Sequence, residues 1–259
     1  MYMNSEYKIL NKFNGTFGCV ILYKYKNNYM IIKKQQIKNS TIKNEANIYI
    51  KLKNVKNVPN IYNFYRDELS DYIILDYKGI NLNVYKVNNY KKKNYINSIK
   101  NIISNCIKII EEIHNNNIIH RDIKPGNICI KNDIPYIIDF GLSKIYKNKS
   151  QHIKFKKIND IIGSINYVSY NIIQLNEPSR RDDIESFIYV LFYMIISNNE
   201  FDIYNNLNII NKKNKNVLNI FIKKYINNIE FIKLFDYIKS IKFNIKPNYI
   251  YINNIISQL

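Results

Sequence analysis

The sequence predicts an α+β fold in which a small β-rich part precedes a larger, mainly helical part. Short apolar runs that are typical of strands occur at residues 8–10, 20–25, 29–32 and 72–75. Helical patterns occur at 41–53, 102–113 and 184–196, so only one of them falls among the strands. The chain has 259 residues, 46% of them hydrophobic, which is enough to bury one large domain or two closely joined lobes.

The first strands are interrupted by a short glycine-containing segment at 14–18, where Asn14 and Gly15 are typical of a hairpin turn. The strand at 29–32 runs into two lysines, Lys33 and Lys34. Neighbouring residues of a strand face opposite sides of the sheet, so only one of the two lysines can point into a site beside it.

The helical pattern at 41–53 places Ile42, Tyr49 and Leu52 on one face. Glu45 lies on the same face, three residues after Ile42 and four before Tyr49. A carboxylate in an apolar stripe usually needs a cation, and the lysine of the preceding strand is the natural partner. A solvated glutamate at the edge of the stripe is the alternative.

Two apolar segments connect these elements to the centre of the chain. The strand at 72–75 leads into a turn at 76–79. The helix at 102–113 is amphipathic and delivers the chain to His120. Its inward residues are expected to be Ile103, Cys106, Ile107, Ile110 and Ile113.

The stretch from His120 to Gly141 is the centre of the prediction. Between Asn127 and Asp139 it reads as a tight antiparallel hairpin, with a polar turn at 131–134. Folding the hairpin about Asp133 brings Asn127 and Asp139 opposite one another, where both could hold one Mg²⁺ ion.

The polar residues of this stretch suit phosphoryl transfer, in which a protein mainly positions groups and supplies charge. In this interpretation Asp122 accepts or orients the attacking hydroxyl, and Lys124 lies against the transferring phosphate. Asn127 and Asp139 hold the metal ions.

At these residues the chain resembles the eukaryotic protein kinases, whose signature H-R-D-x-x-x-x-N followed by D-F-G is complete from His120 to Gly141. The resemblance implies the two-lobed protein kinase fold: a small antiparallel β-sheet lobe with one main helix, and a larger, mainly helical lobe. It implies a kinase domain over 1–259, with an N-terminal lobe at 1–76, a hinge at 77–79 and a C-terminal lobe at 80–259. ATP and Mg²⁺ are the implied cofactors.

The nucleotide-binding residues are also expected from this resemblance. Gly15, Gly18 and Val20 match the glycine-rich loop that covers the phosphates, but Phe13 replaces its first glycine, which predicts weakened ATP binding. Lys33 overlays the phosphate-contacting lysine, with Lys34 as the alternative, and Glu45 overlays its partner. Asp76 and Lys78 fall at the hinge, whose backbone groups meet adenine in kinases.

Later segments are similar to the casein kinase 1 family, with the vaccinia-related kinases as a second choice. The segments that carry this likeness are Gln151–Phe155, Gly163–Asn171, Ser179–Ser186 and Phe243–Tyr249. The likeness is weakest at 198–229. It implies that Asp183 bonds to the backbone of the catalytic loop, and an interpretation of Asp183 as a helix N-cap is compatible with that role. The family's anion-binding arginine is Asn166 here, which argues against a preference for pre-phosphorylated substrates.

Composition adds limits to this interpretation. The net charge of +19 comes from scattered lysines, which is typical of a solvated basic surface and does not imply nucleic acid, although acidic protein substrates are compatible with it. Cys19, Cys106 and Cys129 are expected to be reduced core thiols. Residues 1–6 lack a signal-peptide pattern, and the longest apolar run, 188–196, is too short to cross a bilayer.

The sequence therefore predicts an intracellular, monomeric serine/threonine protein kinase that is cytoplasmic or nuclear. Ile, Asn, Lys and Tyr dominate the composition, and their codons are rich in A and T. If the genome is viral, the expected location is a host cell. Its expected partners are ATP and proteins with Ser or Thr acceptors. A pseudokinase scaffold and a small-molecule kinase are the rival hypotheses. Phe13 is the support for the first, and the shared H-x-D-x-x-x-x-N pattern for the second.

Overall fold

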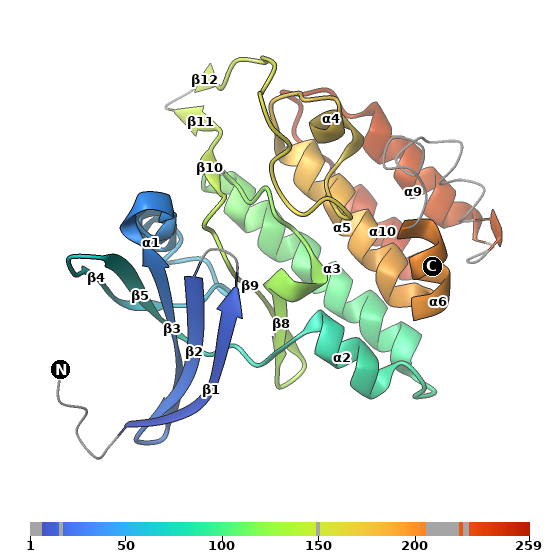
Figure 1. The fold of residues 1–259 in the computed structure, drawn as a ribbon. Helices are drawn as coiled ribbons and strands as arrows, with labels where there is room; N and C mark the ends of the chain where they lie inside the picture. The colour runs from blue at the N-terminus through green and yellow to red at the C-terminus, as the bar shows by residue number, and fades with distance from the viewer. Residues whose placement is uncertain (1–6, 16–17, 149–150, 206–222, 225–227) are drawn as a thin grey trace.

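The computed structural model of the protein describes residues 7–15, 18–148, 151–205, 223–224 and 228–259. A β-sheet forms the N-terminal part and helices dominate the rest, so the predicted α+β class is confirmed. Figure 1 shows the sheet in blue on one side of the molecule and the later helices, green to red, on the other.

The N-terminal sheet has five antiparallel strands in the order β1-β2-β3-β5-β4. They are β1 Tyr7–Gly15, β2 Gly18–Tyr25, β3 Asn28–Gln36, β4 Ile61–Arg66 and β5 Ser70–Asp76. β3 is the middle strand, so Lys33 pairs with Val20 on one side and Ile73 on the other. β4 has no counterpart among the predicted strands, because it is an edge strand in which no residue is fully buried.

The connection between β1 and β2 differs from the expected Asn-Gly turn. Gly15 pairs with Gly18, so residues 16 and 17 alone connect the two strands, and Asn14 and Gly15 belong to β1. The predicted turn at Asn14 and Gly15 is therefore wrong, because the strand pairing continues past it. Residues 16 and 17 themselves lie outside the described part of the chain.

One α-helix accompanies the sheet, α1 Ile42–Lys51, after a short 3-10 turn η1 Ile37–Asn39. It lies within the predicted range of 41–53. Its buried side includes Ile42, Glu45 and Tyr49, and the buried Leu52 follows it, so the predicted face is confirmed.

The helical part follows residues 77–79, which connect β5 to β6. In chain order its elements are β6 Ile80–Asn81, α2 Leu82–Asn89, α3 Tyr95–Asn115, β7 Ile118–Ile119, η2 Pro125–Asn127, β8 Ile128–Lys131, β9 Ile134–Ile137, β10 Lys144–Ile145, β11 Lys147–Asn148, β12 Gln151–His152, α4 Tyr170–Ile173, α5 Arg180–Ile195, α6 Asn198–Asn205, α9 Ile229–Ser240 and α10 Tyr249–Gln258. Residues 206–222 and 225–227 of the weakly matched stretch 198–229 lie outside the described residues.

The helical core is centred on α3 and α5. All five residues predicted to face inward from α3 are buried. The helix starts seven residues before the predicted residue 102, at Tyr95, because Tyr95 and Ile99 extend the same buried stripe. α5 is buried on most of its circumference, including Phe187, Tyr189 and Phe192, as expected for a helix surrounded by others.

The beginning of α5 corrects one expectation. The N-cap residue is Ser179, whose backbone N–H donates to Asp182 Oδ2 at 2.7 Å. Asp183 is the fourth residue of the helix, so the interpretation of Asp183 as the N-cap is wrong. Its carboxylate does not cap the helix and instead accepts hydrogen bonds from the backbone of His120 and Arg121.

The hairpin of β8 and β9 is tighter than predicted. Lys131 pairs with Ile134, so the turn consists of Asn132 and Asp133, which have φ values of 52° and 60°. Positive φ at both positions is what a two-residue hairpin turn requires. Asn127 O accepts from Ile138 N at 3.0 Å, so Asp139 lies one residue beyond the position opposite Asn127.

Glycine is required where the N-terminal part meets this hairpin. Gly79 has a φ of +89°, and a Cβ at this position would overlap the Ile130 carbonyl of β8. A larger residue would push the connection between the two parts away from β8.

Two remaining expectations concern thiols and membranes. Cys19, Cys106 and Cys129 are free, and the last two are buried, whereas Cys19 on β2 is partly exposed and does not belong to the core. Within the described residues, no helix combines the length and the apolar character that crossing a bilayer requires.

We predict that Ile110→Ala in α3 lowers the free energy of unfolding by about 2–5 kcal/mol, because the Ile110 side chain is fully buried and its removal leaves a cavity. Ile96→Ala, the same change on the same helix at a residue that is 39% exposed, is the matched control. Urea unfolding measures both. An equal loss in the two variants would contradict the assignment of the buried face.

Candidate active site

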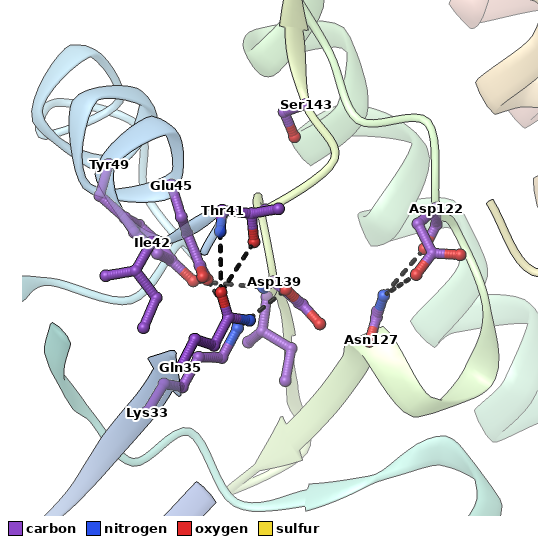
Figure 2. A network of polar contacts seen from close by, with 12 residues as sticks. Lys33, Gln35, Thr41, Ile42, Glu45, Tyr49, Asp122, Asn127, Asp139 and Ser143 are labelled. Carbon is purple, nitrogen blue, oxygen red and sulfur yellow. Dashed lines mark hydrogen bonds and ion pairs between the residues drawn. The ribbon is translucent and has the colours of Figure 1, made fainter. Parts of the chain in front are cut away.

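An ion pair joins β3, α1 and the segment after β9. Lys33 Nζ lies 2.7 Å from Glu45 Oε1 and 2.8 Å from Asp139 Oδ1. Figure 2 shows the ammonium reaching both carboxylates, with Tyr49 beside Glu45 on the same helix. The predicted Lys33–Glu45 ion pair is therefore present, and it also includes Asp139.

The pKa values in this cluster follow from burial and charge. Burial alone would raise the pKa of Asp139, but the Lys33 ammonium outweighs it and lowers the pKa to about 2. Burial alone would lower the pKa of Lys33, but Asp139 and Glu45 raise it above its usual value. At neutral pH, Lys33 is thus a cation and Asp139 an anion, as metal or phosphate binding would require.

Lys34, the alternative to Lys33, faces away from this cluster. Its Nζ lies 5.1 Å from the centre of the Tyr72 ring, which belongs to the neighbouring strand β5. The two lysines point to opposite sides of the sheet, as the alternation of a strand requires. Lys33 is the one that reaches the carboxylates.

The catalytic-loop residues are bonded to one another around Asp122. Asn127 Nδ2 donates to Asp122 Oδ2 at 3.0 Å and to the Asp122 carbonyl at 2.9 Å. Lys124 Nζ lies 2.7 Å from Asp122 Oδ2 and donates to Ser164 Oγ at 2.9 Å. The backbone N–H of Ser164 donates to Asp122 Oδ1 at 2.9 Å. The Asp122 carboxylate is thereby fixed in orientation.

Aromatic contacts link this loop to α1 behind the ion pair. Phe140, the residue after Asp139, is fully buried. Its ring centre lies 5.1 Å from that of Tyr49 and 4.9 Å from that of His120. Asp139 N also donates to Tyr49 Oη at 3.2 Å. A shift of α1 would therefore disturb Asp139 through packing as well as through charge.

A chain of buried hydrogen bonds supports the backbone of the catalytic loop. Asp183 Oδ2 accepts from the backbone N–H of His120 at 2.7 Å, and Oδ1 accepts from that of Arg121 at 2.8 Å. His114 Nε2 lies 2.9 Å from Asp183 Oδ2, and its Nδ1 lies 2.5 Å from Tyr249 Oη. The predicted bonds from Asp183 to the catalytic-loop backbone are confirmed.

A pocket between the two parts of the chain contains most of the predicted nucleotide-binding residues. Val20, Ile31 and Leu75 from the sheet face Cys129 and Ile138 from the hairpin region. The polar lining residues are Lys33, Asp76, Lys78, Asn127 and Asp139. A pocket with apolar walls and several charged lining residues suits a flat ring that carries an anionic chain.

The two predicted loop glycines are not part of this lining. Gly18 has a φ of +155°, and a Cβ there would overlap the carbonyl of Lys34 on β3. Close packing of β2 against β3 therefore explains this glycine without a ligand. Val20, two residues later, is the residue of the loop that lines the pocket.

At the other end of the pocket, the predicted hinge residues bond to each other. Lys78 Nζ lies 2.6 Å from Asp76 Oδ2 and 4.6 Å from the centre of the Tyr136 ring on β9. Asp76 Oδ1 also accepts from the backbone N–H of Asn60 at 2.8 Å. These side chains brace the connection between the two parts, and the backbone N–H of Tyr77 within it donates to the Tyr29 carbonyl at 3.1 Å.

A second pocket adjoins the first. It is lined by Asp122, Lys124, Asp139 and Ser164, and by Gln35 and Thr41 from the N-terminal part. Asp139 lines both pockets. Molecules bound in the two pockets would therefore meet at the charged residues between them.

The residues between the pockets suit Mg²⁺. The amide nitrogen of Asn127 is bonded to Asp122, so the amide oxygen is the group left for a cation, and the Asp139 side chain is 40% exposed. Figure 2 shows the Asp139 carboxylate between Lys33 and Asn127. No group of three or more His, Cys, Asp or Glu residues that could hold a metal occurs among the described residues. Few protein ligands are typical of Mg²⁺ that is also held by phosphates.

Several residues of the site were not predicted from the sequence. His114 and Tyr249 support the loop, as does Phe140, which was expected only as part of the D-F-G motif, and Cys129, expected only as a core thiol, lines the first pocket. A signal existed for His114, because it is a polar residue at the end of the apolar stripe of α3. Tyr249 ends the segment Phe243–Tyr249 that carries the family likeness, but that segment does not indicate its partner His114, which lies 135 residues away.

Three of the segments that resemble the casein kinase 1 family contact one another. The Phe243 ring centre lies 4.8 Å from that of His152 and 5.2 Å from that of Phe155. Arg181 reaches the same neighbourhood and donates to the Ile241 carbonyl at 3.0 Å. Three separate parts of the chain thus form one surface cluster beside α5.

A comparison with known families places this geometry in context. The family model described as Protein kinase domain matches residues 13–244. The match runs from the end of β1 to the segment before α10, and it includes Lys33, Glu45, Asp122 and Asp139.

We predict that stability falls as the pH drops below about 6.5, through His114. Burial lowers the pKa of His114 below its usual 6.5, although Asp183 opposes this. The unfolded chain therefore takes up a proton that the folded chain does not, which costs up to about 1.4 kcal/mol per pH unit.

His114→Gln removes this titrating group, so its free energy of unfolding should depend less steeply on pH than that of the wild type. Urea unfolding between about pH 5 and pH 7.5 measures the two slopes, with the wild type as the reference. Equal slopes would show that His114 titrates alike in the folded and unfolded chains.

Proposed function

The chain belongs to the protein kinase family, and we propose that it transfers the γ-phosphate of ATP to Ser or Thr hydroxyls of proteins in a Mg²⁺-dependent reaction. The single observation that carries the proposal is the convergence of Lys33, Asp122, Asn127 and Asp139 on two adjoining pockets. These residue types are the ones that phosphoryl transfer needs.

In the proposed reaction, the nucleotide lies in the first pocket and the acceptor hydroxyl in the second. Asp122 accepts the hydroxyl proton or orients the hydroxyl, and its bonds to Asn127 and Ser164 hold it in that orientation. Lys124, beside Asp122, lies against the phosphate in transit. Lys33 binds the phosphates and is itself held by Glu45.

Asn127 and Asp139 would hold Mg²⁺, with the low pKa of Asp139 keeping its carboxylate charged. When bound, Mg²⁺ neutralises the phosphate charge that grows in the transition state. The nucleotide base would lie between Val20 and Cys129, next to the backbone of the hinge at 77–79. Gly15 and Gly18 would act through the loop backbone, while Phe13 replaces the first loop glycine and predicts weaker ATP binding.

Specificity for Ser and Thr is supported by the bond between Lys124 and Ser164. In this arrangement the segment after Gly163 is tied to the loop that carries Asp122, and Lys124 and Ser164 follow the pattern of Ser/Thr kinases. The casein kinase 1 type is supported by the segments at 151–155, 163–171, 179–186 and 243–249. Acidic protein substrates, a monomeric state, an intracellular location and the lobe bounds at 76 and 80 stay predictions.

The pseudokinase alternative has one specific observation in its favour, Phe13, which is 55% exposed on β1. The charged residues argue for catalysis, because the Lys33–Glu45 ion pair and the Asp122 network are complete. A chain that only binds partners would have no need for this charge arrangement. We therefore favour an active enzyme.

We predict that the purified protein incorporates labelled γ-phosphate into casein or into itself, and that Asp122→Asn abolishes this incorporation while it retains the fold. The amide cannot accept the hydroxyl proton, although it is nearly isosteric with the carboxylate. Mg²⁺ removal by a chelator should have the same effect. No incorporation by the wild type would favour the scaffold, and phosphate on a small alcohol but on no protein would favour the small-molecule kinase.

We predict that Lys33→Met lowers turnover by about a hundredfold or more, because it removes the phosphate-binding cation and leaves Glu45 buried without its ion pair. Lys34→Met is the matched control on the same strand and should retain turnover close to that of the wild type, since Lys34 faces Tyr72. Steady-state kinetics with varied ATP measures both. Loss of turnover in the Lys34 variant alone would reverse the assignment.

A further inference from the structure

One buried carboxylate, Glu177, has no part in the reaction described above. It lies three residues before α5, and only 2% of its surface is exposed. Lys144 Nζ lies 2.7 Å from Glu177 Oε1, and the Lys144 side chain is 35% exposed. Burial of a carboxylate is unfavourable without a cation, so loss of Lys144 would leave the Glu177 charge buried and unpaired.

Lys144 lies on the segment that leads away from Asp139. It belongs to β10 and pairs with Ile119 of β7, directly before His120 and the catalytic loop. Its neighbour Ser143 donates through Oγ to the His120 carbonyl at 3.2 Å. A cation fixed at Lys144 therefore fixes the start of the segment after Asp139 against the start of the catalytic loop.

Arg121 provides a second cation near Glu177. It precedes Asp122, has a φ of 67°, and donates through Nε to the Leu142 carbonyl at 2.5 Å. Burial lowers the pKa of Arg121, while the carboxylates of Glu177 and Asp183 oppose this. The charge of Glu177 thus acts on the residue next to Asp122 as well as on Lys144.

The backbone that carries Glu177 is itself anchored. Glu177 N donates to the Lys156 carbonyl at 2.9 Å, and Ile158 N donates to the Leu175 carbonyl at 2.9 Å. A β-bridge joins Lys157 and Asn176 between these two bonds. The carboxylate is therefore presented from a rigid ladder that leads directly into the buried helix α5.

We propose that Glu177 is a positioning residue for phosphoryl transfer. Its carboxylate holds Lys144 at 2.7 Å and attracts the Arg121 cation, and through their segments it keeps Asp139 and Asp122 in the arrangement of Figure 2. The inference rests on the proposed function, because it assigns Glu177 to the same site. Loss of the negative charge removes the ion-pair partner of Lys144 and one of the two carboxylates that act on Arg121, which displaces both segments.

The chain offers a matched control for this inference. Asp71 in β5 is also a fully buried carboxylate, and it pairs with the partly exposed Arg66, whose Nε lies 2.5 Å from Asp71 Oδ1. This pair lies on the edge of the N-terminal sheet and lines neither of the two pockets of the site. Asp71→Asn therefore makes the same chemical change as Glu177→Gln away from Asp122 and Asp139.

The experiment measures kcat and the KM for ATP of Glu177→Gln, Lys144→Ala, the double variant, Glu177→Asp and Asp71→Asn in the full chain. We expect Glu177→Gln to lower kcat by about tenfold to a hundredfold with little change in KM, because small displacements of reacting groups have effects of this size. The double variant should be no worse than the poorer single variant. Glu177→Asp should recover most of the activity, and Asp71→Asn should match the wild type.

A second measurement does not depend on activity. Hydrogen exchange of the backbone amides at 144–148 and 151–158 should be faster in Glu177→Gln than in the wild type, and unchanged in Asp71→Asn. Wild-type kcat retained in Glu177→Gln, an equal fall in Asp71→Asn, or unchanged exchange at 144–148 and 151–158 would each overturn the inference. An inactive wild type with faster exchange in Glu177→Gln would instead reject the proposed function. It would still show that Glu177 fixes the segment that carries Lys144.

Discussion

The structure depends on one electrostatic constraint, the position of the Lys33 ammonium between two carboxylates. Glu45 comes from α1 and Asp139 from the segment after β9, so one cation ties the N-terminal sheet, its helix and the helical part together. The constraint is strong because Glu45 is buried and cannot exchange its partner for water. The edge-on and tilted ring contacts of Phe140 with Tyr49 and His120 make the same connection through packing.

The helical part acts as a rigid support for residues that lie on loops. α5 is buried along most of its length, and it presents Asp183 to two backbone N–H groups of the catalytic loop. His114 and Tyr249 complete this brace from α3 and α10. Loops are more mobile than helices, so precise placement of Asp122 requires that the loop backbone before it be bonded to a buried helix.

Much of this could be predicted from local patterns. The complete motif from His120 to Gly141 identified the charged residues, and the position of Glu45 in the apolar stripe of α1 predicted its cation. Errors arose where local signals compete: Asn14 and Gly15 resemble a turn but continue β1, and Asp183 resembles an N-cap but lies inside α5. The edge strand β4 escaped prediction because partly exposed residues show no clear alternation.

The sequence by itself determined the α+β class, the buried faces of α1 and α3 and the types of charged residue, because periodicity and motif spacing are local properties of the chain. Only the tertiary structure decided which lysine of β3 meets Glu45, and that Asp139 joins them. It alone brought Tyr249 to His114 and Glu177 to Lys144. These pairs are separated by many residues, and their contacts follow from how the buried helices pack, which no short stretch of sequence encodes.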